Sequence, residues 1–219
     1  MPFLIKHNTI NHVTVIQLVD VELGATIEIL TKGALLNSWH LRQGEELHQF
    51  VMGNEANTSN AFESKGFRSA KMSPYVCRLY KGQYTHLDTT YTMDRFYMGE
   101  HAIHGIMYDA EFIVQATEAN EHQAAVILVH HYLGSDKGYP FPFTMHVKWI
   151  LEKNNKVSVQ TTVINDGAVS IPIVDGWHPY FTLGESIDNC SLQFSSIGKM
   201  EYDSNLLPTG NIIVDDRFS

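Results

Sequence analysis

Three short segments of the 219-residue chain carry side chains that could do chemistry together. They are residues 78–84, 102–105 and 175–183, which hold an arginine, two histidines and a group of aromatic rings. An imidazole can act as a general acid or base near neutral pH, because its ordinary pKa is about 6.5. A guanidinium donates several hydrogen bonds in a fixed plane, which suits the recognition of hydroxyl groups.

His178 has the richest surroundings of these candidates. Pro179 follows it and biases its backbone toward the extended conformation, while Trp177 and Tyr180 place aromatic rings beside it. Aromatic faces pack against the C–H groups of a pyranose, so the segment suits sugar binding, and we expect Asp175, Trp177 and Tyr180 to contact the ligand. His178 could then act as a general acid. The alternative is a structural histidine at the end of a strand.

His104 and Arg78 are weaker candidates when each is considered alone. His104 precedes Gly105, which lets another strand or a ligand approach closely because it has no side chain. Arg78 lies in a stretch rich in β-forming residues and could bind sugar hydroxyls with its planar set of donors. A surface ion pair is the alternative for such an arginine.

Other kinds of catalytic site lack their sequence patterns. Among the 12 histidines, the closest pairs are His101 with His104 and His130 with His131. Adjacent residues of a strand point to opposite faces, and the chain has no His-x-His pattern, so we expect no metal site. The sequence also lacks a nucleophile elbow and a glycine-rich phosphate loop.

The charge and composition of the chain disfavour several classes of binding partner. Fifteen Lys and Arg against 24 Asp and Glu give a net charge of −9, which disfavours binding to nucleic acid and to anionic membranes. No apolar stretch approaches the roughly 18 residues of a membrane helix, and the N-terminus lacks a secretory signal, so we expect a cytoplasmic protein. Cys77 and Cys190 form no metal or redox motif, and we expect two buried free thiols.

The elements that position these side chains are predicted to be β-strands. Large apolar residues occupy the odd positions from Phe143 to Leu151, and after an Asn-rich break the alternation resumes with Val157, Val159, Thr161 and Val163. This period of two predicts an antiparallel hairpin. Residues 13–19, 25–31 and 124–132 also predict strands, whereas residues 53–71, rich in Asn and Ser, predict a loop. We therefore expect residues 1–219 to form a single all-β domain, a large antiparallel β-sandwich without long helices.

Six motifs, in the same order, resemble those of the aldose 1-epimerase (galactose mutarotase-like) family. Residues 33–39 (GALLNSW) resemble its early glycine-alanine strand, and Arg78 with Lys81-Gly82 resembles its Arg-x-x-x-Gly segment. Residues 103–105 resemble its Leu-His-Gly motif, and residues 138–140 resemble its Gly-Tyr-Pro turn. Residues 178–183 resemble its His-x-Tyr-Phe-x-Leu motif, and residues 207–210 resemble its Pro-Thr-Gly turn.

The resemblance implies a β-supersandwich that binds a free aldohexose and interconverts its α and β anomers without a cofactor. This reaction opens the hemiacetal ring: a base removes the proton of the anomeric hydroxyl while an acid protonates the ring oxygen. By the same resemblance, His178 is the general acid and His104 hydrogen-bonds the sugar near the ring oxygen. Arg78 binds hydroxyl groups.

The C-terminal part of the chain departs from the family pattern. The family's base is a glutamate near the C-terminus, with a sugar-binding aspartate upstream, whereas this sequence ends at Ser219, soon after the Pro-Thr-Gly turn. We therefore expect the last strands and the base to be missing. Asp215 and Phe218 only faintly resemble the aspartate motif, and Asp175 or Glu185 are alternative carboxylates close to His178.

Three functional hypotheses remain open. The first is an aldose 1-epimerase or a fragment of one, and the second is a non-catalytic carbohydrate-binding β-sandwich that lacks the base. The third is a β-sandwich that serves protein–protein contacts. The sequence predicts neither the identity of the sugar, nor whether it is phosphorylated, nor the oligomeric state.

Overall fold

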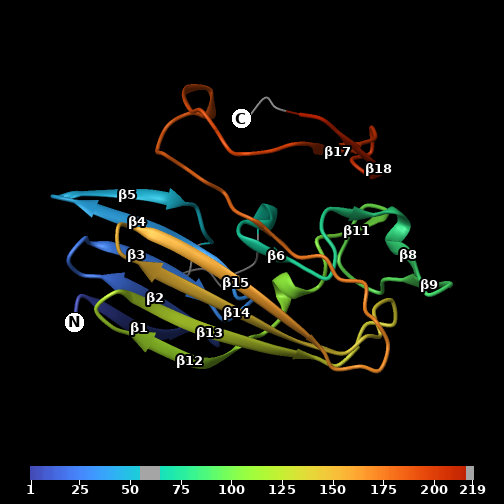
Figure 1. Cartoon of the computed structure of the whole chain (residues 1–219), viewed down its shortest axis with the longest axis horizontal. Helices are drawn as coiled ribbons and strands as arrows, with labels where there is room; N and C mark the ends of the chain where they lie inside the picture. The colour runs from blue at the N-terminus through green and yellow to red at the C-terminus, as the bar shows by residue number, and fades with distance from the viewer. Residues whose placement is uncertain (55–64, 216–219) are drawn as a thin grey trace.

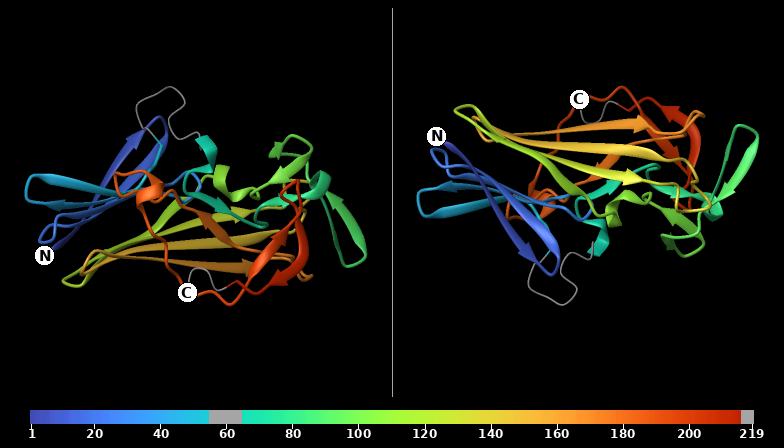
Figure 2. Two further views of the ribbon diagram at one scale, coloured as in Figure 1. Left: turned by 90° about the horizontal axis from the view of Figure 1, so that it is seen from above. Right: turned by 90° about the horizontal axis from the view of Figure 1, so that it is seen from below.

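The fold is a sandwich of two antiparallel sheets with smaller β-ribbons at one end (Figure 1). A computed structural model describes residues 1–54 and 65–215. The first sheet is a five-stranded meander: β1 (Phe3–Ile10), β2 (Val13–Asp20), β3 (Ala25–Leu30), β4 (Leu36–Gln43) and β5 (Glu46–Val51). The second has four strands: β12 (Ile113–Ala119), β13 (Gln123–Tyr132), β14 (Phe143–Glu152) and β15 (Lys156–Asn165). The two sheets form separate layers when the molecule is viewed from above or below (Figure 2).

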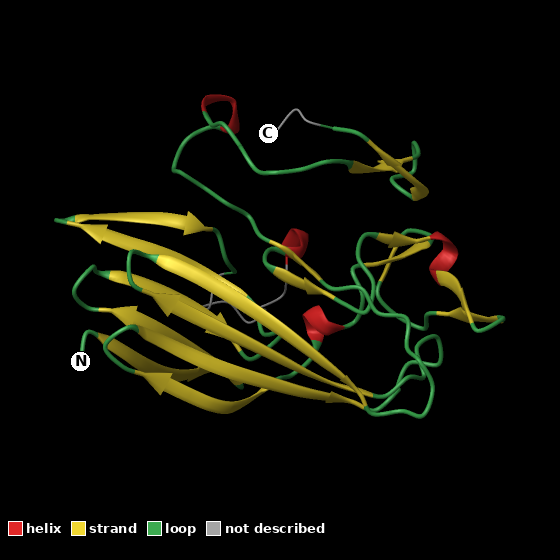
Figure 3. Cartoon of the chain, viewed as in Figure 1, coloured by secondary structure: helices red, strands yellow, loops and turns green. Residues whose placement is uncertain are grey.

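Four short ribbons complete the strand arrangement. They are β6 (Ala70–Met72) with β16 (Gly176–His178); β7 (Arg78–Leu79) with β11 (His101–Ile103) and β10 (Tyr97–Met98); β8 (Gln83–His86) with β9 (Thr89–Thr92); and β17 (Lys199–Tyr202) with β18 (Pro208–Ile213). The helices of the described residues are single 3-10 turns: η1 (Lys65–Phe67), η2 (Tyr80–Gly82), η3 (Met107–Asp109) and η4 (Ile187–Asn189). Strands therefore dominate, as Figure 3 shows, and none of the helices seen here could span a membrane.

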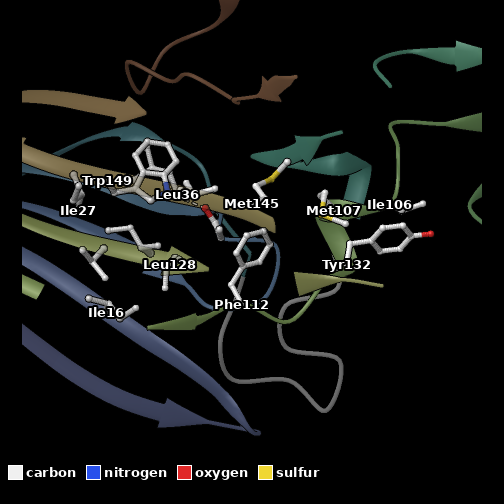
Figure 4. Packing of buried hydrophobic residues seen from close by; sticks show 14 of the residues in the cluster. Ile16, Ile27, Leu36, Ile106, Met107, Phe112, Leu128, Tyr132, Met145 and Trp149 are labelled. Atoms are coloured by element: carbon white, nitrogen blue, oxygen red, sulfur yellow. Dashed lines mark hydrogen bonds between the residues drawn. The ribbon is translucent and has the colours of Figure 1, made fainter. Parts of the chain in front are cut away.

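The core lies between the two sheets, and the period-two pattern explains which residues fill it. The odd positions of β14 that the sequence marks as apolar, from Phe143 to Leu151, are all buried. Leu128 of β13 pairs with Val147 of β14, and both are fully buried. Figure 4 shows Leu128 and Trp149 of this sheet packed with Ile16 and Ile27 of the other. The indole N–H of Trp149 crosses between the layers and donates to the Ala34 carbonyl at 2.8 Å.

Most of the predicted elements are confirmed. The hairpin is β14–β15, and the other three predicted strands are β2, β3 and β13. The predicted loop at residues 53–71 lies largely outside the described residues. The predicted C-terminal boundary of this loop was wrong, because Ala70 and Lys71 belong to β6. Both cysteines are free, as expected. Their predicted burial was wrong, since Cys190 is exposed and Cys77 is half-buried.

The segment after β16, described to residue 215, packs less tightly than the sandwich. It runs as an extended segment to the β17–β18 hairpin, which lies above β11 and β8 in Figure 1. Its large apolar side chains are mostly exposed, and Ile197 reaches 95%. Burial of apolar surface is the main stabilising contribution to folding, so this region adds little to the core.

Candidate sugar-binding site

A two-stranded ribbon places His178. In the β6–β16 pair, His178 lies opposite Ala70, and the Ser69 amide donates to the His178 carbonyl at 2.9 Å. The extended backbone expected before Pro179 is present, because His178 is the last residue of β16.

A neighbouring ribbon places Arg78 and His104. Arg78 of β7 pairs with Ile103 of β11, and the chain then turns at His104, whose φ is +61°. The His104 amide donates to the Cys77 carbonyl at 2.9 Å, which holds this turn beside the start of β7. Gly105 follows with a φ of +78°, and it lies so close to Ser73 that a Cβ atom would be 2.1 Å from the Ser73 carbonyl oxygen. Glycine is therefore required here for both conformation and space.

The two histidine rings meet. Their centroids are 5.2 Å apart at an interplanar angle of 71°. Tyr180 stacks on His178 at 5.5 Å and 24°, and its hydroxyl donates to the Gly66 carbonyl at 2.8 Å. Phe67 contacts His104 edge to face at 4.6 Å. Residues far apart in the sequence thus form one aromatic and imidazole cluster, which brings together His104, His178 and Tyr180 as the sequence predicts.

His104 is held in its neutral form. Burial, with smaller contributions from His178 and Arg78, lowers its pKa from 6.5 to about 4. Its Nδ1 atom is buried and has no hydrogen-bond partner among the described residues. A neutral imidazole has one N–H group that donates a hydrogen bond and one nitrogen that accepts one, so His104 can hydrogen-bond a ligand near pH 7. It is not suited to be the general acid, because it carries no extra proton at that pH.

Arg78 supplies positive charge at the same place. Its guanidinium lies near enough to His104 to contribute to that lowered pKa, and Nη2 is 4.0 Å from the Met98 sulfur. Within residues 1–54 and 65–215, no carboxylate lies within ion-pair distance of Arg78. The alternative of a surface ion pair is thus not seen in this part of the chain, and the donors of Arg78 are available to hydroxyl groups.

Asp175 and Trp177 have contacts other than those expected of ligand-binding residues. Asp175 forms an ion pair with the buried Lys71, and the Lys71 ammonium lies 4.4 Å from the centre of the Trp177 ring. Trp177 also packs against Trp149 of the core, with ring centroids 5.0 Å apart. Successive strand residues point to opposite faces, so Trp177 faces the sandwich and His178 faces the other way. The structure therefore does not bring Asp175 and Trp177 to the histidine pair.

The remaining carboxylates named from the sequence form no ion pair with either histidine among the described residues. Asp215 is buried and forms an ion pair with Lys199 at 3.0 Å, while Glu185 is exposed. Phe218 lies outside the described residues. Among the ion pairs of the described residues, none joins a carboxylate to His104 or His178. The same residues contain no group of three His, Cys, Asp or Glu side chains that could hold a metal ion.

Sequence reasoning missed two residues of this region. Phe67 and Lys71 both fall in the segment that its Asn and Ser content marked as a loop. Their local sequence offers no signal, because the ring contact of Phe67 and the burial of Lys71 depend on strands from distant parts of the chain.

Comparisons with known proteins agree on the family and on the fold. The family model for aldose 1-epimerase matches residues 16–215. A curated aldose 1-epimerase from Streptococcus thermophilus is 25% identical over 203 residues, which cover 89% of this chain and 56% of that protein. The chain thus spans little more than half the length of this relative.

Two solved structures share the fold over nearly the whole chain. One is a galactose 1-epimerase from Lactobacillus acidophilus, with a TM-score of 0.76, 20% identity, and coverage of 97% of this chain and 62% of the other. A galactose mutarotase-like protein from Clostridium acetobutylicum gives a TM-score of 0.78, 19% identity, and coverage of 97% and 65%. These likenesses confirm the expected β-sandwich fold. Because the family model matches residues 16–215, the chain belongs to the aldose 1-epimerase family.

Proposed function

We propose that this chain binds a free aldohexose over the His104–His178 pair and acts in the interconversion of its anomers. The observation that carries the proposal is the contact between the two imidazoles, with centroids 5.2 Å apart, beside Arg78. Ring opening of a sugar needs a base that takes the proton of the anomeric hydroxyl, a proton donor at the ring oxygen and hydrogen bonds that fix the sugar between them. Of these, the cluster supplies the proton donor and the hydrogen bonds.

The side chains of the cluster differ in protonation and shape, and we assign each a different role in the reaction. His104 is neutral near pH 7, so it is the hydrogen-bonding partner, and His178 is left as the proton donor to the ring oxygen. Arg78 binds hydroxyl groups, and the ring of Tyr180 packs beside the sugar. A positioned general acid typically contributes about 10²- to 10⁴-fold to a rate.

The test is the rate at which fresh α-galactose or α-glucose approaches rotational equilibrium. Galactose is tested first, because the similar structure from Lactobacillus acidophilus is described as a galactose 1-epimerase. The chain is expected to exceed the buffer rate, and His178→Ala is expected to remove the difference. His122→Ala is the matched control, because this exposed histidine precedes β13, away from the cluster. A native rate equal to the buffer rate would exclude catalysis by this chain.

A carbohydrate-binding role without catalysis is the second candidate. The observation that favours it is the lack, among the described residues, of a carboxylate paired with either histidine. Calorimetric titration with hexoses separates the candidates: binding without a rate enhancement supports this role. Neither binding nor catalysis would favour a sandwich that serves protein contacts.

A further inference from the structure

Lys71 is a lysine without any exposed surface, in the middle of β6. A buried ammonium is costly unless it is paired and hydrogen-bonded. Here Nζ forms an ion pair with Asp175, donates to the Thr161 hydroxyl at 2.9 Å, and lies over the ring of Trp177. Burial lowers the pKa of Lys71, and Asp175 opposes that shift. These contacts connect β6 to Asp175, the residue before β16, and to Thr161 on β15 of the four-stranded sheet.

The strand that carries this lysine is bonded to both histidine segments. At one end of β6, Ala70 pairs with His178. Just beyond the other end, Ser73 pairs with Gly105, and its carbonyl accepts the Ile106 amide at 2.8 Å. The backbone of residues 70–73 therefore links the strand of His178 to the turn of His104. A displacement of β6 would change the distance between the two imidazoles.

We infer that Lys71 is a positioning residue for the histidine pair. Its contact with Thr161 anchors β6 to the four-stranded sheet, its ion pair with Asp175 anchors β6 to the start of β16, and β6 in turn keeps the two histidines together. Lys71 acts through the backbone, because its buried side chain faces the sandwich and does not reach the cluster. The consequence for histidine geometry is independent of function, whereas the consequence for sugar affinity rests on the proposed function.

The test replaces the ion pair in the double variant Lys71→Met/Asp175→Asn. Removing both partners leaves no unpaired buried charge, so the variant is expected to stay folded. The first readout is the titration of the His104 imidazole, followed by NMR. In the native chain its pKa is held at about 4 by burial, His178 and Arg78. We expect the variant to raise it by about one unit or more toward the ordinary value.

The second readout is hexose affinity by calorimetry, which we expect to fall by about tenfold or more because the site is displaced. Thr161→Val removes only the hydrogen bond from Lys71, so a smaller rise of the His104 pKa and a smaller loss of hexose affinity are expected. This variant is used if the double variant does not fold. Lys156→Met is the matched control, because it breaks an exposed pair with Glu152 on the same sheet and is expected to change neither readout.

The outcomes separate the two claims. If the double variant shifts the His104 titration but the native chain binds no hexose, the positioning role is supported and the proposed function is refuted. If the folded double variant keeps the native His104 titration and the native hexose affinity, Lys71 is only a structural residue and the inference is wrong. An equal shift in Lys156→Met would also overturn it, because the effect would then be unrelated to β6.

Discussion

The chemistry of the cluster follows from the different environments of its two imidazoles. His104 is buried against Phe67 and lies beside the charge of Arg78, and both features disfavour its protonated form. His178 sits at the end of β16 and stacks on the half-exposed ring of Tyr180. The two imidazoles are in contact but have different surroundings, and the proposed function rests on this difference.

The lowered pKa of His104 makes stability depend on pH. Its pKa is about 4 in the folded chain and about 6.5 when unfolded, so the unfolded chain binds the extra proton between these values. Stability from this group is fully present above pH 6.5 and is lost as the pH falls from 6.5 toward 4. The loss is at most about 3 kcal/mol. Urea unfolding across this pH range measures it.

The control for this prediction is His104→Asn, since Asn tolerates the positive φ of this position and does not titrate. Carboxylates titrate in both proteins, so the relevant quantity is the difference between their pH profiles. The variant is expected to lose less stability than the native chain between pH 6.5 and 4. Parallel profiles would mean that His104 is not protected from protonation.

Arg78 is expected to be needed for affinity. Hydrogen bonds from a charged group contribute about 1.5–3 kcal/mol, so Arg78→Met should weaken hexose binding by about 10- to 100-fold. Arg42→Met is the control, because Arg42 is exposed on β4, in a different part of the sandwich. Calorimetry measures both variants. Equal affinities for Arg78→Met and the native chain would remove Arg78 from the site.

The sequence predicts the members of the cluster better than their contacts. His104, His178, Arg78 and Tyr180 stand in motifs, because their chemistry is visible in their residue types. Whether a side chain faces the site or the core depends on strand direction, and Trp177 shows this, since it packs on Trp149 instead. A pattern of residue types cannot give that direction when the strand is only three residues long.

The turn between β11 and η3 is the element that sets the position of His104. Gly105→Ala would place a Cβ atom 2.1 Å from the Ser73 carbonyl oxygen and also impose a positive φ on a residue with a side chain. We expect it to destabilise the chain by about 3 kcal/mol. Gly99→Ala is the matched control: its φ is +64°, but no atom lies within 4 Å, so about 1 kcal/mol is expected.

Urea denaturation measures both glycine variants. Similar losses of stability in the two would show that Gly105 is needed only for its backbone conformation and does not lie tightly against Ser73. The expected result is a loss of stability in Gly105→Ala that is much larger than the loss in Gly99→Ala.

Long strands were predictable and short ones were not. β14 and β15 are ten residues each, so their alternation repeats several times. β6 has three residues, too few for a pattern, and it forms because Ala70, Lys71 and Met72 find partners in β16, more than a hundred residues later. Such pairings depend on the assembled fold, and local propensity does not reveal them.

The sandwich as a whole is stabilised by the apolar core between its two sheets. Leu128 is fully buried there, and Leu128→Ala is expected to cost about 3 kcal/mol. Val159→Ala on β15 should cost less than about 1 kcal/mol, because this side chain is 39% exposed. Thermal or urea unfolding tests both variants. A comparable cost for the two would mean that β15 is as tightly packed as β13.

The apolar side chains of the chain are not evenly buried. The two sheets bury most of theirs, whereas Phe181, Leu183 and Ile187, beyond β16, remain exposed. Average hydrophobicity does not report this distribution, because it depends on which strands pack together. Exposed apolar side chains are available for association, so solution experiments on this chain should include its oligomeric state.

The most direct test of the central claim is an NMR titration of the histidine ring signals with galactose. If a pyranose binds over the His104–His178 pair, both signals move together and saturate at the same galactose concentration. Signals of distant histidines such as His7 and His122 stay in place. Saturable shifts confined to other histidines, or no saturable shift at all, would contradict a sugar site at this pair.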